Sequence, residues 1–587
     1  MQAGAALTLQ GNDYENRVQI NVNNYDKYNA YFLLGNAGAL EMRAKHISLL
    51  DYVRIDASTS YLNYNHVMSD PSNDLTNPYE NDNKGKGGLV DLCAEETITL
   101  KGKGAPHLIP IEIVPNRNHM WDKKVESPVH IDMSSYGTGH AGELKMESSN
   151  ISIGDDVKID GYAGFIGNGP TIRFNASETL LLHGTKEPVY FETIINNKSF
   201  DTWAFPVDIA LTSEWRAKSG ELYMRAKNIF LKDYVTINLN SYATTTARSG
   251  DIYINAQEDF RFEGIVNDHY QSKIDISCLI HDTFDFNILD TYSLSGKLFL
   301  NANNISISNA LIVSKIGDWN ITCMGGKAGE ISLNANNSIH LNNTIINNFI
   351  SARFDFLDET RDNSISLSGN EVVMNNTTIA GTTTGYIPGG KIIITGRNRC
   401  IIDNQSSIKS ESYLNNDKLD VDNPKNPTAG EIYIHSPVFE LNNDSLISVV
   451  TYGIGDAGKI EIKGVQDNEV NEKQTQIHHA CNMVRLSNKS HIASLSVLTN
   501  AEEKSGDAGD IIIASKNLVL DHSYILSASD SSGKGGRISI GKKLLINHEN
   551  NSVSIMEQGD LISLQNSTIT TAGQRTISDQ AGNIELG

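Results

Sequence analysis

The chain has 587 residues, and its 48 basic and 70 acidic residues give a net charge of −22. Such an acidic surface disfavours nucleic acid and anionic membranes as partners, so no nucleic acid is expected. No run of about 18 apolar residues occurs, which argues against a transmembrane helix, and the first residues lack the basic and apolar regions of a signal peptide.

A glycine followed by alternating apolar residues recurs from one end of the chain to the other. The first full copy covers residues 38–55 and contains three short runs in which every second residue is apolar. Further full copies begin at Gly142, Gly220 and Gly296. Residues two apart project from the same face of a strand, so each run predicts a short β-strand with one buried face.

Thirteen glycines, which we call the anchor glycines, mark this repeat. Each follows a small residue and opens a Gly-x-apolar-x-apolar segment: Gly38, Gly88, Gly142, Gly220, Gly250, Gly296, Gly329, Gly390, Gly430, Gly458, Gly509, Gly536 and Gly582. We expect each to adopt a positive φ or to turn the backbone where a Cβ atom would clash.

Three short strands separated by Gly, Asn, Asp and Ser corners, repeated without a helical period, predict an all-β fold, a single-stranded parallel β-helix with loop insertions. Coils would stack about 4.8 Å apart, so each strand would pair with its counterpart one coil later. Like residues would then form ladders, and asparagine side chains would hydrogen-bond along the stack.

The spacing from Gly509 to Gly536 and from Gly220 to Gly250 predicts single coils, whereas longer spacings predict insertions or degenerate coils. The whole chain, 1–587, is expected to be one continuous β-helix and a segment of a longer protein. The predicted insertions or degenerate coils are 58–86, 103–139, 161–216, 258–293, 350–387, 411–427 and 464–506.

The repeat unit resembles those of filamentous haemagglutinin-like exoproteins of two-partner secretion systems. The match is clearest from Ala508-Gly509-Asp510-Ile511 to Ile525-Leu526-Ser527. This resemblance implies a right-handed parallel β-helix, export through an outer-membrane transporter partner, and adhesive or structural work at the bacterial cell surface. The Asn-Pro pairs at 77–78, 423–424 and 426–427 lack the continuations of the family's N-terminal secretion motifs. The segment is therefore expected to lie downstream of that domain or to belong to a distant relative.

No catalytic, cofactor-binding or metal site is predicted. Asp155-Asp156 matches bend positions of other coils and is interpreted as a corner, not as a catalytic pair. The acidic group at 355–362 is interpreted as a salt-bridged loop or, alternatively, as a carboxylate pair acting on a glycan. His478-His479-Ala480-Cys481 suggests a metal but lacks a second ligand pair. The five scattered cysteines give no disulfide framework, and Cys93 and Cys323 are expected as small buried residues.

Recognition is expected on loops rather than on the coils themselves. The candidate residues are Trp121, Trp203 and Trp215, with Trp319 beside another break in the repeat. Exposed aromatic rings there could stack on sugars or anchor a protein, or could instead cover the side of a coil.

The predicted function is a secreted or cell-surface β-helical adhesin or structural rod that attaches to a protein or glycan of a host or neighbouring cell. The alternatives are a polysaccharide-active β-helix enzyme, such as a tailspike-like depolymerase, and the stalk of a contact-dependent toxin.

Overall fold

The computed structural model describes the chain except for the following residues: 24–35, 60–85, 104–106, 111–122, 136–138, 165–166, 196–197, 216, 244–245, 267–269, 281–291, 318–322, 355–362, 386, 414–427, 454, 466–468, 472–474, 498–505, 531–532, 548–551 and 574–581. The described residues contain strands, turns and bends and no α-helix. Consequently, no helix in this part of the chain is long and apolar enough to cross a membrane.

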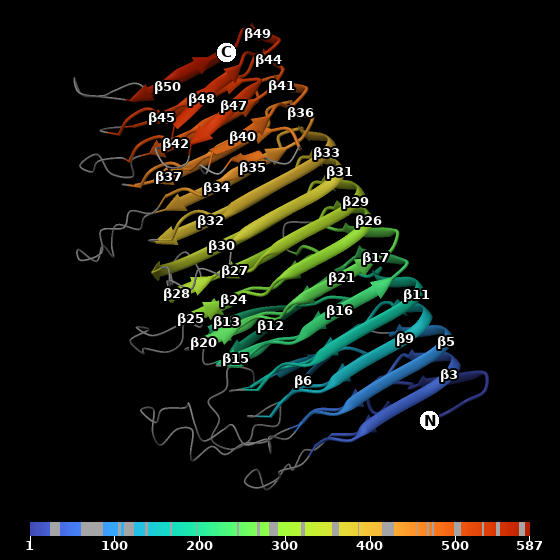
Figure 1. Cartoon of the computed structure of the whole chain (residues 1–587). Helices are drawn as coiled ribbons and strands as arrows, with labels where there is room; N and C mark the ends of the chain where they lie inside the picture. The colour runs from blue at the N-terminus through green and yellow to red at the C-terminus, as the bar shows by residue number, and fades with distance from the viewer. Residues whose placement is uncertain are drawn as a thin grey trace. The chain divides into compact units, whose positions relative to one another are not determined.

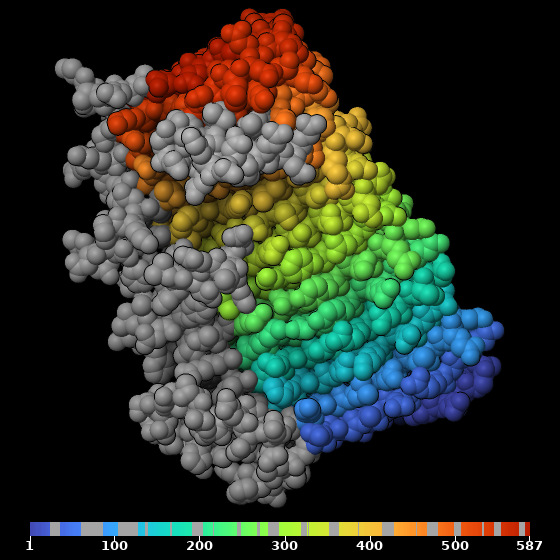
Figure 2. All heavy atoms as spheres, in the orientation of Figure 1, coloured from blue at the N-terminus to red at the C-terminus, as the bar shows by residue number. Residues whose placement is uncertain are grey.

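The chain divides into two compact units. Unit 1 comprises 1–286, 295–297 and 309–311, and unit 2 comprises 287–294, 298–308 and 312–587. Within each unit the strands lie side by side as successive rungs (Figure 1), and the coils form parallel bands on the visible surface (Figure 2). That residues 1–587 form one continuous β-helix stays a prediction.

The strands of unit 1 are β1 (Ala6–Gln10), β2 (Val18–Asn21), β3 (Ala39–Leu50), β4 (Val53–Asp56), β5 (Leu89–Lys101), β6 (His107–Pro110), β7 (Lys123–Glu126), β8 (Val129–Asp132), β9 (Glu143–Ile153), β10 (Val157–Asp160), β11 (Thr171–Gly184), β12 (Val189–Ile195), β13 (Lys198–Ala204), β14 (Val207–Ala210), β15 (Ser213–Trp215), β16 (Glu221–Ala226), β17 (Asn228–Asp233), β18 (Val235–Asn238), β19 (Ser241–Ala243), β20 (Thr246–Arg248), β21 (Ile252–Ala256), β22 (Asp259–Gly264), β23 (Lys273–Asp275) and β24 (Cys278–Ile280).

The strands that belong wholly or mainly to unit 2 are β25 (Tyr292–Leu294), β26 (Leu298–Ser308), β27 (Leu311–Ile316), β28 (Cys323–Lys327), β29 (Ile331–Asn342), β30 (Ile345–Phe354), β31 (Ser364–Asn375), β32 (Thr378–Gly385), β33 (Lys391–Asp403), β34 (Ser407–Tyr413), β35 (Ile432–His435), β36 (Val438–Leu441), β37 (Leu446–Tyr452), β38 (Ile460–Lys463), β39 (Glu469–Asn471), β40 (Thr475–His479), β41 (Met483–Ser487), β42 (His491–Val497), β43 (Ile511–Ala514), β44 (Asn517–Asp521), β45 (Tyr524–Ser529), β46 (Ile538–Gly541), β47 (Lys543–Asn547), β48 (Ser552–Glu557), β49 (Leu561–Gln565), β50 (Thr568–Gly573) and β51 (Ile584–Leu586).

The predicted parallel β-helix is confirmed by strand pairing and by burial. In the coil that begins at Gly220, strands β16, β17 and β18 pair in parallel with β21, β22 and β23 of the next coil. The apolar residues of these three strands point inward and are almost fully buried: Leu222, Met224, Ile229, Leu231, Val235 and Ile237. The two-residue period therefore places one continuous aliphatic column on each strand of the coil.

Several segments predicted as insertions or degenerate coils contain regular coil strands. Residues 161–216 contain the coil strands β11, β14 and β15, and only the antiparallel hairpin β12–β13 leaves the stack. Pro170 takes the place of the anchor glycine there, since its carbonyl accepts a hydrogen bond from Glu221 N at 2.9 Å. Residues 103–139 combine a hairpin, β6–β7, with the coil strand β8.

The other segments predicted as insertions or degenerate coils also contain coil strands where the structure describes them. Strands β22, β23 and β24 lie within 258–293, and β31 lies within 350–387, all in parallel pairs. In 464–506, β41 and β42 are coil strands, whereas β40 joins an antiparallel sheet. Almost all of 58–86 and 411–427 lies outside the described residues.

Most of the anchor glycines, Gly38 and Gly390 excepted, lie against the backbone of the preceding coil, and of the two expected reasons for them the clash is correct. A Cβ atom on Gly142 would fall on the carbonyl oxygen of Gly88, and the same relation joins Gly250 to Gly220 and Gly458 to Gly430. No described anchor glycine is among the residues with positive φ. Glycine is required because successive backbones approach each other too closely for a side chain.

Positive φ occurs instead at the corner after the second strand of many coils. In unit 1 this corner is held by Asp51, Asp156, Asp233 and Asn309, and in unit 2 mainly by asparagine: Asn343, Asn376, Asn404, Asn443, Asn488 and Asn566. Aspartate and asparagine tolerate the left-handed region better than other residues that carry a Cβ atom. The interpretation of Asp155-Asp156 as a corner is confirmed.

The predicted asparagine ladder is present in unit 2. The amide of Asn376 donates to Asn343 Oδ1 at 3.1 Å, and Asn488 donates to Asn443 Oδ1 at 2.8 Å. A parallel ladder joins the neighbouring residues Asn375 and Asn342 at 2.9 Å. An amide both donates and accepts, so identical side chains satisfy one another along the stack.

An antiparallel sheet of β39, β40, β47 and β48 accompanies the coils of unit 2. Leu544 and Val553 of this sheet form a small apolar cluster with Ile512 and Ala514 of β43. Because Ile511 and Ile513 fill the coil interior, Ile512 lies on the outer face of its strand. The added sheet therefore covers part of the outer surface of the coils.

Candidate functional site

The tryptophans predicted for recognition are not brought together among the described residues. Trp203 lies in the hairpin strand β13, opposite Tyr190 of β12, which is 44% exposed. Trp215 ends the coil strand β15 and pairs with Ala243. The side chains of both tryptophans, and all of Trp121 and Trp319, lie outside what the structure describes.

The other candidates from the sequence have structural partners or lie outside the described residues. Asp155 accepts hydrogen bonds from the backbone N and the hydroxyl of Thr185 at 2.5 and 2.6 Å. The acidic group at 355–362 lies outside the described residues. No group of three or more His, Cys, Asp or Glu side chains that could hold a metal occurs in the described part of the chain.

Two of the described cysteines are buried and unreactive. Cys400 and Cys481 are buried free thiols, and burial raises the pKa of each to about 12. Thiols of such high pKa stay protonated and are poor nucleophiles. Cys93, expected to be buried, is only half-buried, because it occupies an outward position of β5 between Leu92 and Ala94. The side chain of Cys323 is outside the described residues.

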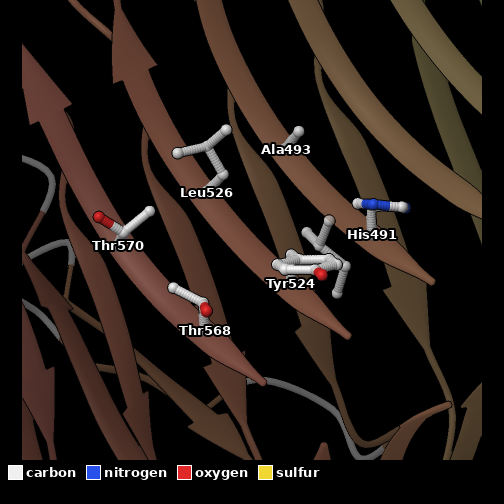
Figure 3. A pocket seen from close by; sticks show the side chains of 7 residues that line it. His491, Ala493, Tyr524, Leu526, Thr568 and Thr570 are labelled. Carbon is white, nitrogen blue, oxygen red and sulfur yellow. The ribbon is translucent and has the colours of Figure 1, made fainter. Parts of the chain in front are cut away.

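A shallow hollow of about 280 Å³ lies on the outer face of β42, β45 and β50 in unit 2 (Figure 3). Its lining residues are His491, Ile492, Ala493, Tyr524, Leu526, Thr568 and Thr570. The parallel register produces this arrangement, since His491, Tyr524 and Thr568 are partners in one row and Ala493, Leu526 and Thr570 in the next. We call this surface the Tyr524 hollow.

Tyr524 is the dominant side chain of the hollow. Its ring stacks on His491 with centroids 5.0 Å apart and an interplanar angle of 15°, and 43% of the residue is exposed. On its other side the next residue in the row is the shorter Thr568 (Figure 3). The second face of the ring therefore has no aromatic neighbour in its row, and the side chain of Thr568 lies there instead.

A similar aromatic pair occurs elsewhere in unit 2. Tyr413 and Tyr452 stack at 4.3 Å and 9°, and both are only partly exposed. Burial, followed by the charge of Glu411, raises the pKa of both phenols above the usual value for tyrosine. This pair provides an internal comparison for the Tyr524 hollow.

Unit 1 carries a charged surface that the sequence analysis missed. The second and fourth residues of β4, β8 and β10 point outward and alternate between a basic and an acidic residue: Arg54 and Asp56, His130 and Asp132, Lys158 and Asp160. Arg54 lies 3.4 Å from Asp56, and Lys158 lies 3.4 Å from Asp160. The pattern Val-basic-Ile-Asp, repeated three times, was the available signal.

The acids of this ion-pair ladder are fixed by their own strands. Asp132 Oδ1 accepts hydrogen bonds from the backbone N of Ser134 at 3.1 Å and from its hydroxyl at 2.6 Å, and Asp56 is held in the same way by Ser58. Asp132 is 2% exposed. A carboxylate held this way stabilises a corner and is poorly placed to act on a substrate.

A second polar cluster lies on the outer face of β35 and β38 in unit 2. Glu461 is 2% exposed and lies 2.6 Å from Lys459 and 3.0 Å from Lys463. His435 is the partner of Lys463 in the neighbouring strand. Burial, and then the charge of Lys463, lowers the pKa of His435 to about 4, so its imidazole is neutral near pH 7.

Comparisons with known proteins give no relative. No family model matches the chain, and neither a curated protein nor a solved structure is significantly similar to it.

Proposed function

We propose that this chain is an exported β-helical protein that attaches a cell to a glycan-bearing surface and binds the glycan at the Tyr524 hollow. The observation that carries the proposal is the stacked, partly exposed ring of Tyr524 in an apolar hollow that two threonine side chains border. Export through an outer-membrane transporter rests on the resemblance of the repeats to two-partner secretion exoproteins.

The chemistry of the hollow suits a sugar ring better than a charged ligand. The face of an aromatic ring is slightly negative and attracts the C–H groups of a sugar. Threonine hydroxyl groups donate and accept hydrogen bonds, as sugar hydroxyl groups do. Apolar atoms of Leu526 and Ala493 complete the lining. The site is shallow, so we expect weak binding per site and attachment through many copies of the protein.

The binding experiment compares the full chain with two variants on a glycan array and on cell surfaces. Tyr524→Ala removes the exposed ring, and we expect binding to fall at least about tenfold, the equivalent of roughly 1.4 kcal/mol. The matched control is Tyr452→Ala, which removes one ring of a stacked tyrosine pair outside the Tyr524 hollow. Thermal melting of both variants separates loss of the site from loss of fold.

Equal binding by the wild-type chain and Tyr524→Ala would remove the hollow from the proposal. Export is tested separately by asking whether antibody reaches the protein on intact source cells, and whether deletion of their outer-membrane transporter abolishes this. An intracellular protein would contradict the proposed role altogether.

A further inference from the structure

The ion-pair ladder of unit 1 is interrupted in two consecutive coils. Strands β14 and β18 follow β10 in register, and β23 follows them. In β14, Asp208 stands where the ladder has a basic residue, and Ala210 stands where it has an aspartate. In β18 these two positions are Thr236 and Asn238. The pairing resumes in β23, where Lys273 lies 3.1 Å from Asp275. The coils of β14 and β18 therefore lack the cation that β4, β10 and β23 carry.

Three buried oxygen atoms remain without a hydrogen-bond partner at this interruption. They are Asp208 Oδ1, Thr236 Oγ1 and Asn238 Oδ1, which lack a partner among the described residues. Thr236 is 1% exposed. Buried polar oxygen atoms are nearly always paired, and three adjacent exceptions indicate a ligand that supplies what the protein does not.

These oxygens lie on one small patch of the surface. Asp208 and Thr236 are direct partners across the parallel strands, and Asn238 is two residues beyond Thr236 on the same face. The fourth corner of the patch is Ala210, the partner of Asn238, which adds no polar group there. A carboxylate, a hydroxyl group and an amide oxygen thus lie on one patch of two adjacent strands.

The neighbouring lysines are engaged by other carboxylates. Lys158, the register partner of Asp208, pairs with Asp160 at 3.4 Å, and Lys273, the register partner of Thr236, pairs with Asp275 at 3.1 Å. Burial raises the pKa of the Asp208 carboxyl, and the nearby lysines only partly oppose this effect. The carboxylate would be stabilised by a positive charge placed directly against it.

We infer that Asp208, Thr236 and Asn238 bind a hard, oxygen-preferring cation, and that this cation is Ca²⁺. Calcium accepts carboxylate, hydroxyl and amide oxygens together and tolerates irregular geometry, whereas Mg²⁺ requires a near-ideal octahedron. A site with one carboxylate belongs to the weak class, with a Kd on the order of 10⁻⁴–10⁻³ M that suits an extracellular protein. The inference is independent of glycan binding.

The experiment uses the full chain, treated with a chelator and then titrated with CaCl₂ at constant ionic strength. Calorimetry should show one saturable site, and the melting temperature of unit 1 should rise with CaCl₂ and not with equivalent MgCl₂ or NaCl. Asp208→Asn should abolish saturation. Asp132→Asn is the matched control, because this carboxylate occupies an outward position of the uninterrupted ladder and its loss should leave calcium binding unchanged.

A variant that should bind Ca²⁺ more tightly than the wild type distinguishes loss of the site from misfolding. Asn238→Asp adds a second carboxylate at the patch and should lower the Kd for Ca²⁺ about tenfold. Absence of saturable binding in both the wild type and Asn238→Asp would overturn the inference. A melting temperature that responds to NaCl and not to CaCl₂ would overturn the assignment to calcium. Unchanged binding by Asp208→Asn would show that the ion binds elsewhere.

Discussion

Units 1 and 2 carry different side chains at the corner where successive coils stack with a positive φ. At the positive-φ corner, unit 1 mainly uses aspartate, in alternate coils, and side chains of neighbouring coils contact it: Gln10 donates to Asp51 at 2.6 Å and His183 contacts Asp233 at 2.7 Å. Unit 2 stacks asparagine on asparagine. Carboxylates in adjacent coils, about 4.8 Å apart, would repel, so other residues separate the aspartates, whereas an amide is its own complement.

The anchor column is common to both units, and its disruption should have the largest effect. Gly250→Ala in unit 1 and Gly458→Ala in unit 2 would each force a Cβ atom onto a backbone carbonyl of the preceding coil. We expect each to lower the free energy of unfolding by about 4 kcal/mol, because backbone cannot move aside as a side chain can. Chemical denaturation measures this.

Gly38→Ala is the control for the anchor column. Its nearest neighbour would be Val22 Cβ at 3.6 Å, an ordinary contact. A loss of stability within about 0.5 kcal/mol is expected there. Equal losses at all three glycines would show that the column does not act through steric clash.

The ion-pair ladder should make unit 1 sensitive to loss of a single carboxylate. Asp132→Ala leaves Ser134 without its acceptor and Arg54, 3.9 Å away, without one of its acids. We expect a loss of about 3 kcal/mol, measured by urea unfolding. Asp132→Asn keeps an oxygen for Ser134 and should cost less. A loss that disappears in high salt would mean that the ladder behaves as an exposed surface.

Acid should destabilise unit 2 through His435. The folded protein lowers the pKa of this imidazole from the ordinary histidine value of 6.5 to about 4. Between these values the unfolded chain binds more protons, so stability falls as pH falls through this window. We expect a loss of about 2 kcal/mol by pH 4, with allowance for partial exposure.

Melting curves from pH 7 to pH 4 for the wild type and His435→Gln measure the effect. The variant should lose this part of the pH dependence, while Lys463 and Glu461 remain in place. An identical pH profile in the variant would assign acid sensitivity to other groups.

The asparagine ladder should show the smallest effect. Asn376→Ala removes the hydrogen bond to Asn343 and places alanine at φ 45°, so we expect a loss of about 1–2 kcal/mol. Asn376→Gly relieves the backbone and loses only the amide, and should cost about 1 kcal/mol or less. Thermal melting of the two variants separates the ladder from the corner. If Asn376→Gly lost more stability than Asn376→Ala, the positive φ of residue 376 would not be the reason why alanine is unfavourable there.

The sequence by itself predicted the fold because its two-residue period is a local property. Leu222, Met224 and Ile229 had to share an inner face once the strands were recognised, and glycine had to occur where coils approach most closely. It also predicted the corner role of Asp156 and the asparagine ladder. It did not reveal that Pro170 replaces an anchor glycine in a coil that lacks the motif.

Only the tertiary structure decided which outward residues become neighbours, because the register between coils depends on the lengths of the loops and insertions that separate the paired strands. His491, Tyr524 and Thr568 are separated along the chain and become one row only through parallel pairing. Asp208 and Thr236 likewise become neighbours only when β14 lies against β18. Inward positions repeat a fixed pattern and can be predicted locally, whereas outward positions acquire their partners from the stack.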